Sequence, residues 1–122
     1  MAIRVTTNQH TITMPAELTD RLHKLQLAGA FAKRLGEANL YNQLKDAFYS
    51  IKRQWESSAS EMCEKKSKTN WLGGGDVYRY ISFCGDFEDF GSEASAEAIE
   101  SRFGKQGLVD SLNKYISELN NR

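Results

Sequence analysis

Two long runs of apolar residues at helical spacing constrain the fold of this chain most strongly. The first run begins after Pro15, which pre-sets the backbone of a first helical turn, and Gly36 marks its end. Its stripe consists of Leu18, Leu22, Leu25, Ala28, Phe31, Ala32 and Leu35. The second stripe consists of Leu40, Leu44, Phe48, Ile51, Trp55, Ser58 and Met62. Two such helices joined by a short turn predict an antiparallel helical hairpin.

The N-terminal region and the middle of the chain have the pattern of strands instead. Residues 3–7 and 10–14 are β-branched, alternating runs on either side of Asn8 and Gln9, which predicts an N-terminal β-hairpin. Residues 77–84 alternate and are rich in aromatic and β-branched side chains, so they predict a further strand that pairs with the hairpin.

Helical spacing returns near the C-terminus. Ser92 can cap a short helix that ends at Gly104, and apolar residues recur at helical spacing from Leu108 to Leu119. The predicted fold class is therefore α+β: a helix-rich single domain, residues 1–122, with an α-helical hairpin, one or two further C-terminal helices and a small antiparallel sheet. The N-terminal β-hairpin and strand 77–84 make up that sheet.

Composition limits the classes of partner. The 122 residues include 16 Lys and Arg against 16 Asp and Glu, which argues against wholesale coating of nucleic acid or of an anionic membrane. The only cysteines, Cys63 and Cys84, do not form a Cys-x-x-Cys pair, so they read as reduced thiols. The sequence has no apolar run of 18 residues and no signal-peptide start, and we expect a soluble, cytoplasmic protein.

Charge is distributed unevenly along the chain. No basic residue occurs in the 22 positions between Arg79 and Arg102, and acidic residues gather there. These are Asp86, Glu88, Asp89, Glu93, Glu97 and Glu100. Phe83, Phe87 and Phe90 are interleaved with them. An acidic, aromatic surface of this kind suits a basic partner.

No pattern of catalytic or cofactor-binding residues is present. His10 and His23 lie far from either cysteine in the sequence, and the four residues have no zinc-ligand spacing. The glycines at 73–75 lead into Asp76 and a predicted strand, whereas a phosphate loop would lead through Gly-Lys-Ser/Thr into a helix. We therefore expect no cofactor, no metal and no enzymatic activity.

The first functional hypothesis is an inhibitor or regulator that docks an acidic, aromatic face on a basic, nucleic-acid-binding protein. The predicted contact residues are Asp86, Phe87, Glu88, Asp89, Phe90, Glu93, Glu97 and Glu100. Small size, a single domain and near-neutral charge resemble, in kind and not in motif, immunity proteins and phage-encoded anti-defence proteins, including anti-CRISPR and anti-restriction inhibitors. On the alternative interpretation, the phenylalanines point into the core and the carboxylates are merely solvated.

The second hypothesis is DNA binding. The stretch from His10 to Leu22 resembles the strand-then-helix opening of ribbon-helix-helix transcriptional regulators, whose dimeric ribbon reads the major groove. That resemblance implies Thr11 and Thr13 as outward residues, or His10, Ile12 and Met14 in the other register. Lys65, Lys66 and Lys68 would add phosphate contacts. An intramolecular hairpin packed on helices is the competing interpretation of this stretch.

Partners follow from these hypotheses. We expect a basic protein, with nucleic acid as the alternative and no membrane. A homodimer follows if the apolar stripe of residues 108–119 exceeds what the core can cover.

Overall fold

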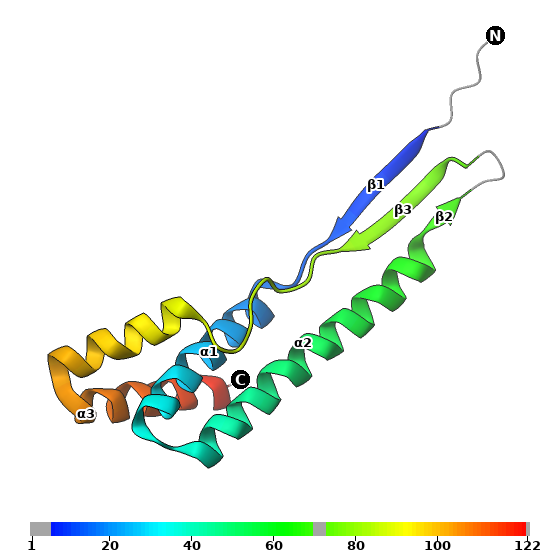
Figure 1. Cartoon of the computed structure of the whole chain (residues 1–122). Helices are drawn as coiled ribbons and strands as arrows, with labels where there is room; N and C mark the ends of the chain where they lie inside the picture. Colours follow the sequence, from blue (N-terminus) through cyan, green and yellow to red (C-terminus); the bar gives the residue numbers. More distant parts are fainter. Residues whose placement is uncertain (1–5, 70–72, 122) are drawn as a thin grey trace, which may run out of the picture. The chain divides into compact units, whose positions relative to one another are not determined.

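The computed structural model describes residues 6–69 and 73–121 and shows an α+β fold (Figure 1). In chain order the elements are β1 (Thr7–Ile12), α1 (Ala16–Leu35), α2 (Ala38–Lys66), β2 (Lys68–Thr69), β3 (Gly75–Tyr80) and α3 (Phe90–Asn120). They form two compact units. The sheet unit comprises the described residues up to 15 and from 52 to 83, and the helical unit comprises 16–51 and 84–121. Helix α2 contributes residues to both units.

The predicted helical hairpin is confirmed. Helices α1 and α2 are separated only by Gly36 and Glu37. Gly36 has φ 77°, and its N–H donates to the Lys33 carbonyl while the Glu37 N–H donates to that of Ala32. Because a left-handed residue lets the chain fold back over the last turn, this glycine ends α1 and allows α2 to begin at Ala38.

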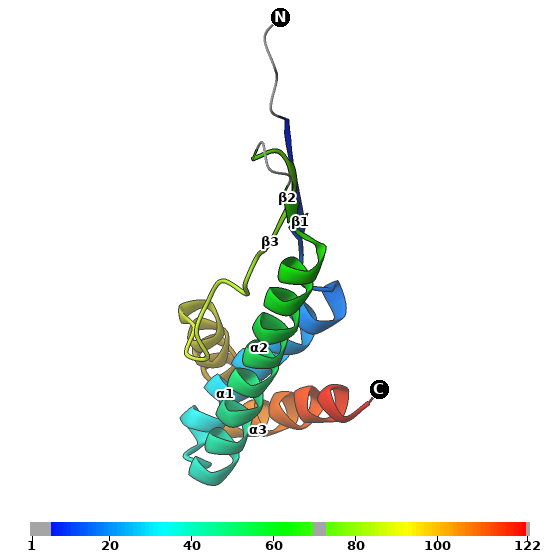
Figure 2. The ribbon, with the colours of Figure 1, turned by 90° about the vertical axis from the view of Figure 1, so that its right-hand side faces the viewer.

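In the helical unit, α1 packs closely against α3 (Figure 2). Small residues on α1 permit this approach, and Ala28 and Ala32 are fully buried. The core is made of apolar side chains from all three helices and the segment before α3. Its members are Leu22, Leu25, Phe31, Leu44, Phe48, Phe87, Ala96, Leu108, Leu112 and Leu119. The stripe predicted on the first helix is therefore the face that this unit buries.

Helix α3 is broken at Gly104, whose backbone is non-helical at φ 71° and ψ −165°. The prediction of one or two C-terminal helices is thus confirmed. The predicted cap is wrong, because α3 begins at Phe90 and its N-cap is Asp89. Asp89 Oδ2 accepts hydrogen bonds from Ser92 N and Ser92 Oγ, at 3.1 and 3.2 Å. Ser92 therefore lies inside the first turn, with its hydroxyl already engaged.

The sheet unit differs from the prediction. Its strand order is β1-β3-β2, with β1 parallel to β3 and β2 antiparallel to β3, so the sheet is mixed and not antiparallel. Asn8 and Gln9 lie inside β1, and no N-terminal hairpin forms at them. Without a glycine to adopt positive φ, this dipeptide continues the extended run. Residues 3–5 of the predicted first strand lie outside the described residues.

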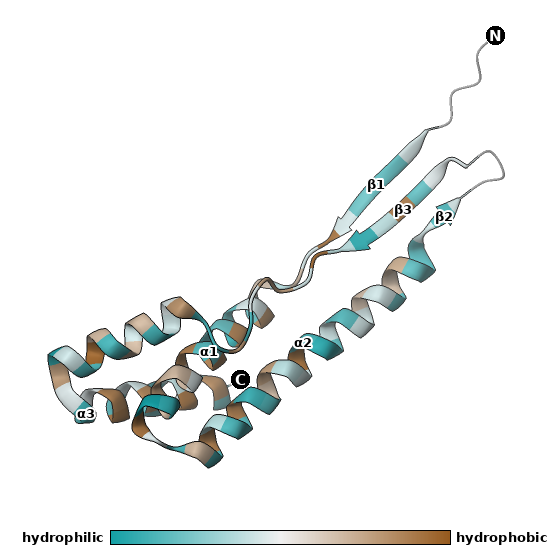
Figure 3. Cartoon of the chain, in the orientation of Figure 1, coloured by the Kyte–Doolittle hydropathy of each residue, from teal (hydrophilic) through white to brown (hydrophobic). Residues whose placement is uncertain are grey.

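Strand β3 begins at Gly75 and ends at Tyr80, whereas the sequence predicted a strand over 77–84. Gly75 begins it because its backbone, at φ 136°, passes so close to β2 that a Cβ would lie 2.0 Å from the Lys68 carbonyl oxygen. After Tyr80, the chain forms hydrogen bonds with side chains of α2. Trp55 Nε1 donates to the Ile81 carbonyl at 3.3 Å, and the Ser82 hydroxyl donates to Glu56. Figure 3 shows β1 coloured mainly as hydrophilic, and its residues from Thr7 to Gln9 are exposed.

Candidate functional site

The acidic segment is held against the helical unit at two points before α3 begins. Gln26 Nε2 donates to the Asp86 carbonyl at 2.7 Å, and the Phe87 N–H donates to the Tyr49 hydroxyl at 3.4 Å. Gln26 is a buried polar residue of α1, so its hydrogen bond to this backbone also satisfies its own amide. These two contacts place the segment against α1, through Gln26, and against α2, through Tyr49, although it lies far from both in sequence.

The three phenylalanines of the segment have different environments. Phe83 is 8% exposed and Phe87 is 2% exposed, whereas Phe90 is 87% exposed. The Phe87 ring lies over Gly29 of α1, the only kind of residue that leaves room for it, since a Cβ there would come within 2.2 Å of the ring. Tyr41 contacts the same ring edge-on, with centroids 5.2 Å apart. Among the predicted contact residues, Phe87 therefore belongs to the core and Phe90 is the aromatic side chain at the surface.

Several carboxylates have basic partners on α1. Lys33 Nζ lies 3.5 Å from Glu88 Oε1 and 3.4 Å from Glu93 Oε1, and Arg34 Nε lies 3.0 Å from Glu100 Oε1. These side chains are largely exposed, so each pair contributes little to the free energy of unfolding. The pairs nevertheless offset part of the negative charge of the segment. The absence of basic residues between Arg79 and Arg102 gives no indication of this compensation, because the partners come from α1.

Tyr41 gives Glu88 a further partner, because the Tyr41 hydroxyl donates a hydrogen bond to Glu88 Oε1. This bond is the largest cause lowering the pKa of Glu88, followed by the charge of Lys33. The same bond raises the pKa of Tyr41 to about 12. The carboxylate of Glu88 is thus stabilised in its ionised form by two residues that lie on different helices.

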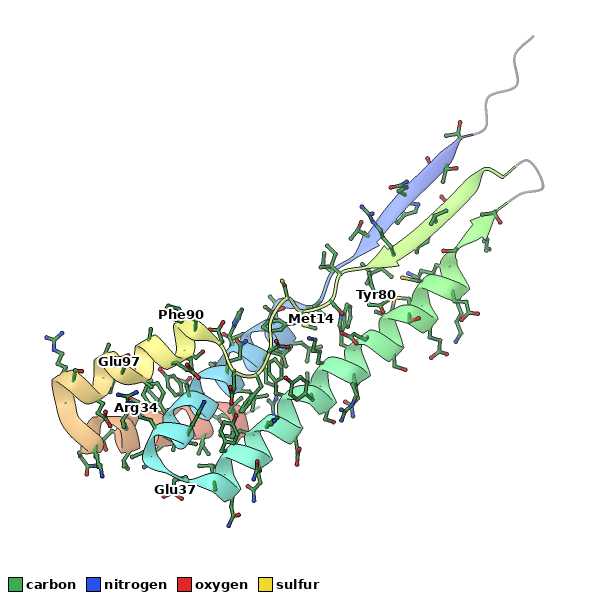
Figure 4. The ribbon with its side chains drawn as sticks, viewed as in Figure 1. Met14, Arg34, Glu37, Tyr80, Phe90 and Glu97 are labelled. Carbon is green, nitrogen blue, oxygen red and sulfur yellow. The ribbon has the colours of Figure 1, made fainter. Side chains whose placement is uncertain are left out.

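Besides Asp89, which caps α3, two of the predicted carboxylates form no ion pair within residues 6–69 and 73–121: Asp86 and Glu97. Both are exposed. Glu97 lines a groove of about 380 Å³ between α1 and the first half of α3, together with Phe90. We call this region the Phe90 surface, and it is lined by Ala30, Lys33, Arg34, Phe90, Glu93, Ala94, Ala96 and Glu97. Figure 4 labels Phe90, Glu97 and Arg34 in this region.

The Phe90 surface combines an apolar floor with a charged rim. Ala30, Ala94 and Ala96 supply small side chains to the groove, while the rim carries acidic and basic residues from the two helices. Sequence patterns did not identify the α1 residues as part of it. The available signal was that Lys33 and Arg34 lie off the apolar stripe of their helix.

The lysines of the DNA-binding hypothesis all have neighbours within the sheet unit. Lys65 Nζ lies 2.9 Å from Glu61 Oε1, and Lys66 Nζ lies 5.7 Å from the centroid of the Tyr78 ring. Lys68 is paired with Asp76 in the β2–β3 register and its charge contributes to lowering the pKa of that carboxyl. The hydrogen bond from His10, at 3.0 Å, is the larger cause.

The threonines of that hypothesis are at the surface. Thr11 and Thr13 are exposed, and Thr11 is in register with Arg79 of β3, which is exposed as well. Gln9 is exposed on the same face, because side chains two residues apart on a strand share a face. His10 and Ile12, candidates in the other register, are half-buried, and His10 stacks on Tyr78 with centroids 4.3 Å apart.

The residues that the structure describes hold no cluster of metal ligands. Across the part of the chain that the structure describes, no three His, Cys, Asp or Glu side chains are grouped as metal ligands. Cys63 is buried, Cys84 is exposed, and both are free thiols. Within the same residues, no helix combines the length and apolar character that crossing a membrane requires.

Comparison of this chain with protein-family models, with curated protein sequences and with solved structures finds no match.

Proposed function

We propose that this chain is a non-enzymatic binding protein that inhibits or regulates a macromolecular partner by occupying it with the Phe90 surface. The observation that carries the proposal is the 87% exposure of Phe90 beside a groove of about 380 Å³. An exposed phenylalanine is costly to keep in water, and interface hot spots are typically aromatic side chains surrounded by a polar rim. The charged rim and small-residue floor of this surface provide such surroundings.

Charge indicates the class of partner. The described residues of the helical unit include eight basic and twelve acidic residues, a formal charge of −4. On the Phe90 surface Lys33 and Arg34 already face carboxylates of α3, whereas Glu97 has no such partner among the described residues. A basic, nucleic-acid-binding protein would therefore gain an ion pair with Glu97 and a faster encounter with the acidic unit. Immunity and anti-defence inhibitors are the class of protein that works in this way.

The test compares two exposed phenylalanines of one helix. Phe90→Ser removes the proposed anchor, and Phe103→Ser is the matched control because Phe103 is 59% exposed and lies outside the groove. Proteins retained from cell extract by the wild type are purified, and their dissociation constants for the wild type, F90S and F103S are measured by calorimetry. We expect F90S to weaken binding by about 30-fold, the equivalent of a hot spot of about 2 kcal/mol. Equal affinity of F90S and F103S would refute the proposal.

DNA binding through the sheet unit is a second candidate, favoured by the exposure of Gln9, Thr11 and Arg79 on one face. These side-chain types bond to base edges and phosphates, and a two-stranded ribbon fits the major groove. The described residues of the sheet unit include six basic and four acidic residues, a formal charge of +2. Titration of fluorescent duplex DNA at rising salt tests this candidate. Arg79→Ala should weaken binding and reduce its salt dependence, and absence of binding at low salt would eliminate it.

A further inference from the structure

Strand β1 has one side that no described strand covers. In the order β1-β3-β2 it lies at the edge of the sheet. Two bonds fix which of its backbone groups face β3: the Thr6 carbonyl accepts from Gly75 N, and the Ile12 carbonyl accepts from Ile81 N, both at 3.0 Å. In a parallel ladder every second residue bonds to the same neighbour. The even-numbered residues of β1 therefore face β3, and the N–H and C=O groups of Thr7, Gln9 and Thr11 face outward.

This edge lacks the features with which proteins usually block strand addition. Natural edge strands carry lysine, proline, a bulge or an inward-pointing charge. β1 reads Thr-Asn-Gln-His-Thr-Ile, without Lys, Arg, Asp, Glu or Pro, and its register with β3 runs without a bulge over all six residues. Thr7, Gln9 and Thr11 are exposed. Six backbone hydrogen-bonding groups are thus aligned and accessible on the outer side.

We infer that the outer edge of β1 pairs antiparallel with β1 of a second copy of this chain. A two-fold axis at Gln9 would set Gln9 opposite Gln9 of the second copy, and Thr7 opposite Thr11 in both directions. In that register each outward N–H meets an outward C=O, so all six groups of each edge are satisfied at once. No charged side chain of β1 opposes its own copy, and Thr–Thr pairs across strands are favourable.

In this register the uncharged residues of β1 oppose their own copies without like-charge repulsion, and Thr7 pairs with Thr11, which is why we assign a second copy to this edge and not an unrelated peptide. The inference concerns the sheet unit alone. It is independent of the function proposed for the Phe90 surface, since Phe90 lies in the helical unit.

The test uses charge at the two-fold axis. Gln9→Lys and Gln9→Glu would each place two like charges opposite one another, about 5.5 Å apart between Cα atoms. Val77→Lys is the matched control: Val77 is in register with Gln9 and is 37% exposed on the same face, but it lies one strand away from the edge. Oligomeric state is measured by analytical ultracentrifugation over a range of concentrations, and circular dichroism verifies that each variant is folded.

We expect the wild type and V77K to be dimers, Q9K and Q9E each to dimerise about tenfold more weakly or worse, and an equal mixture of Q9K and Q9E to form heterodimers. Native mass spectrometry distinguishes the heterodimer by its mass. The inference is overturned if the wild type is monomeric at hundreds of micromolar. It is equally overturned if folded Q9K dimerises as tightly as the wild type, or if the mixture fails to form heterodimers.

Discussion

Gly29→Ala should destabilise the helical unit, although the same change in most helices is stabilising. Gly29 is buried in the middle of α1, beneath the ring of Phe87. An alanine Cβ would lie 2.2, 2.7 and 2.9 Å from three carbons of that ring. Ordinary contacts between carbon atoms are about 3.5 to 4.0 Å, so the ring must move by more than an ångström. Because the ring is rigid, the whole Phe87 side chain has to shift.

The magnitude follows from two opposing effects. Replacing a mid-helix glycine by alanine ordinarily stabilises a protein by about 1 kcal/mol. Overpacking a core costs about 1 to 3 kcal/mol, and driving a buried Phe87 into water would cost about 1.5 to 3 kcal/mol. Phe87 is 2% exposed and packs on Phe48 and Tyr41, with centroids 5.7 and 5.2 Å away, so little room is available for a shift. We expect a net loss of about 1 to 2 kcal/mol, since the packing cost exceeds the helix-propensity gain.

The assay is urea unfolding followed by circular dichroism at 222 nm, which reports the helices. A double variant, Gly29→Ala with Phe87→Leu, controls for the cause. Leucine removes the ring atoms that the new methyl group meets, so the two substitutions together should cost about 1 kcal/mol less than the sum of the single effects. A G29A protein that is more stable than the wild type by about 1 kcal/mol would refute the placement of Phe87 over α1.

Four further predictions concern the same unit. The pKa of Tyr41 is about 12 in the folded protein and 10.0 in the unfolded chain. The unfolded chain therefore loses the tyrosine proton first, so the stabilisation that the raised pKa provides is lost as pH rises through this range. Tyr41→Phe should remove the tyrosine ionisation at about pH 12 from an absorbance titration at 295 nm. The lowered pKa of Glu88 stabilises the folded protein at pH values above 4.5, and this stabilisation is lost as pH falls through the folded pKa. Glu88→Gln should therefore reduce the dependence of the free energy of unfolding on pH in the acid range. An unchanged pH midpoint of acid unfolding would contradict the Tyr41 hydrogen bond. Gly104→Ala should cost about 1 to 3 kcal/mol through backbone strain alone, because a Cβ there meets no atom within 4 Å; a gain in thermal stability would indicate a straight α3. Asp89→Ala should cost about 1 kcal/mol by removing the N-cap, whereas Asp86→Ala should change thermal stability by less than about 0.5 kcal/mol.

The helices were predictable because their signals are local. Pro15 and Gly36 bracket α1 as observed, and the second stripe ran to within a turn of the true end of α2 at Lys66. The predicted cap of α3, Ser92, is wrong because the aspartate three positions earlier is an equally good capping residue. Only the backbone of Asp89, extended at φ −129° and ψ 133°, decides between them.

The sheet and the charge pairing were not predictable, because both depend on contacts distant in sequence. β1 pairs with β3 across more than sixty residues, and although the lack of a glycine at Asn8 and Gln9 disfavours a tight hairpin turn, it does not indicate which distant strand pairs with β1. The charge compensation of the acidic segment is invisible in the local sequence, since Lys33 and Arg34 precede the segment by more than fifty residues. The sequence shows that the candidate contact residues include phenylalanines, but it does not show that Phe87 is buried, because that burial depends on the space that Gly29 leaves on α1.

The proposal that the Phe90 surface binds a basic macromolecule is tested most directly by site-specific photocrosslinking. p-Benzoylphenylalanine is placed at Phe90 in one protein and at Phe103 in another, each is irradiated in cell extract, and adducts are identified by mass spectrometry. Both side chains are exposed phenylalanines of α3, at 87% and 59%, so they differ mainly in proximity to the groove. We predict a dominant adduct with a basic protein from position 90 and not from position 103. The same adducts from both positions, or none from position 90, would contradict the account.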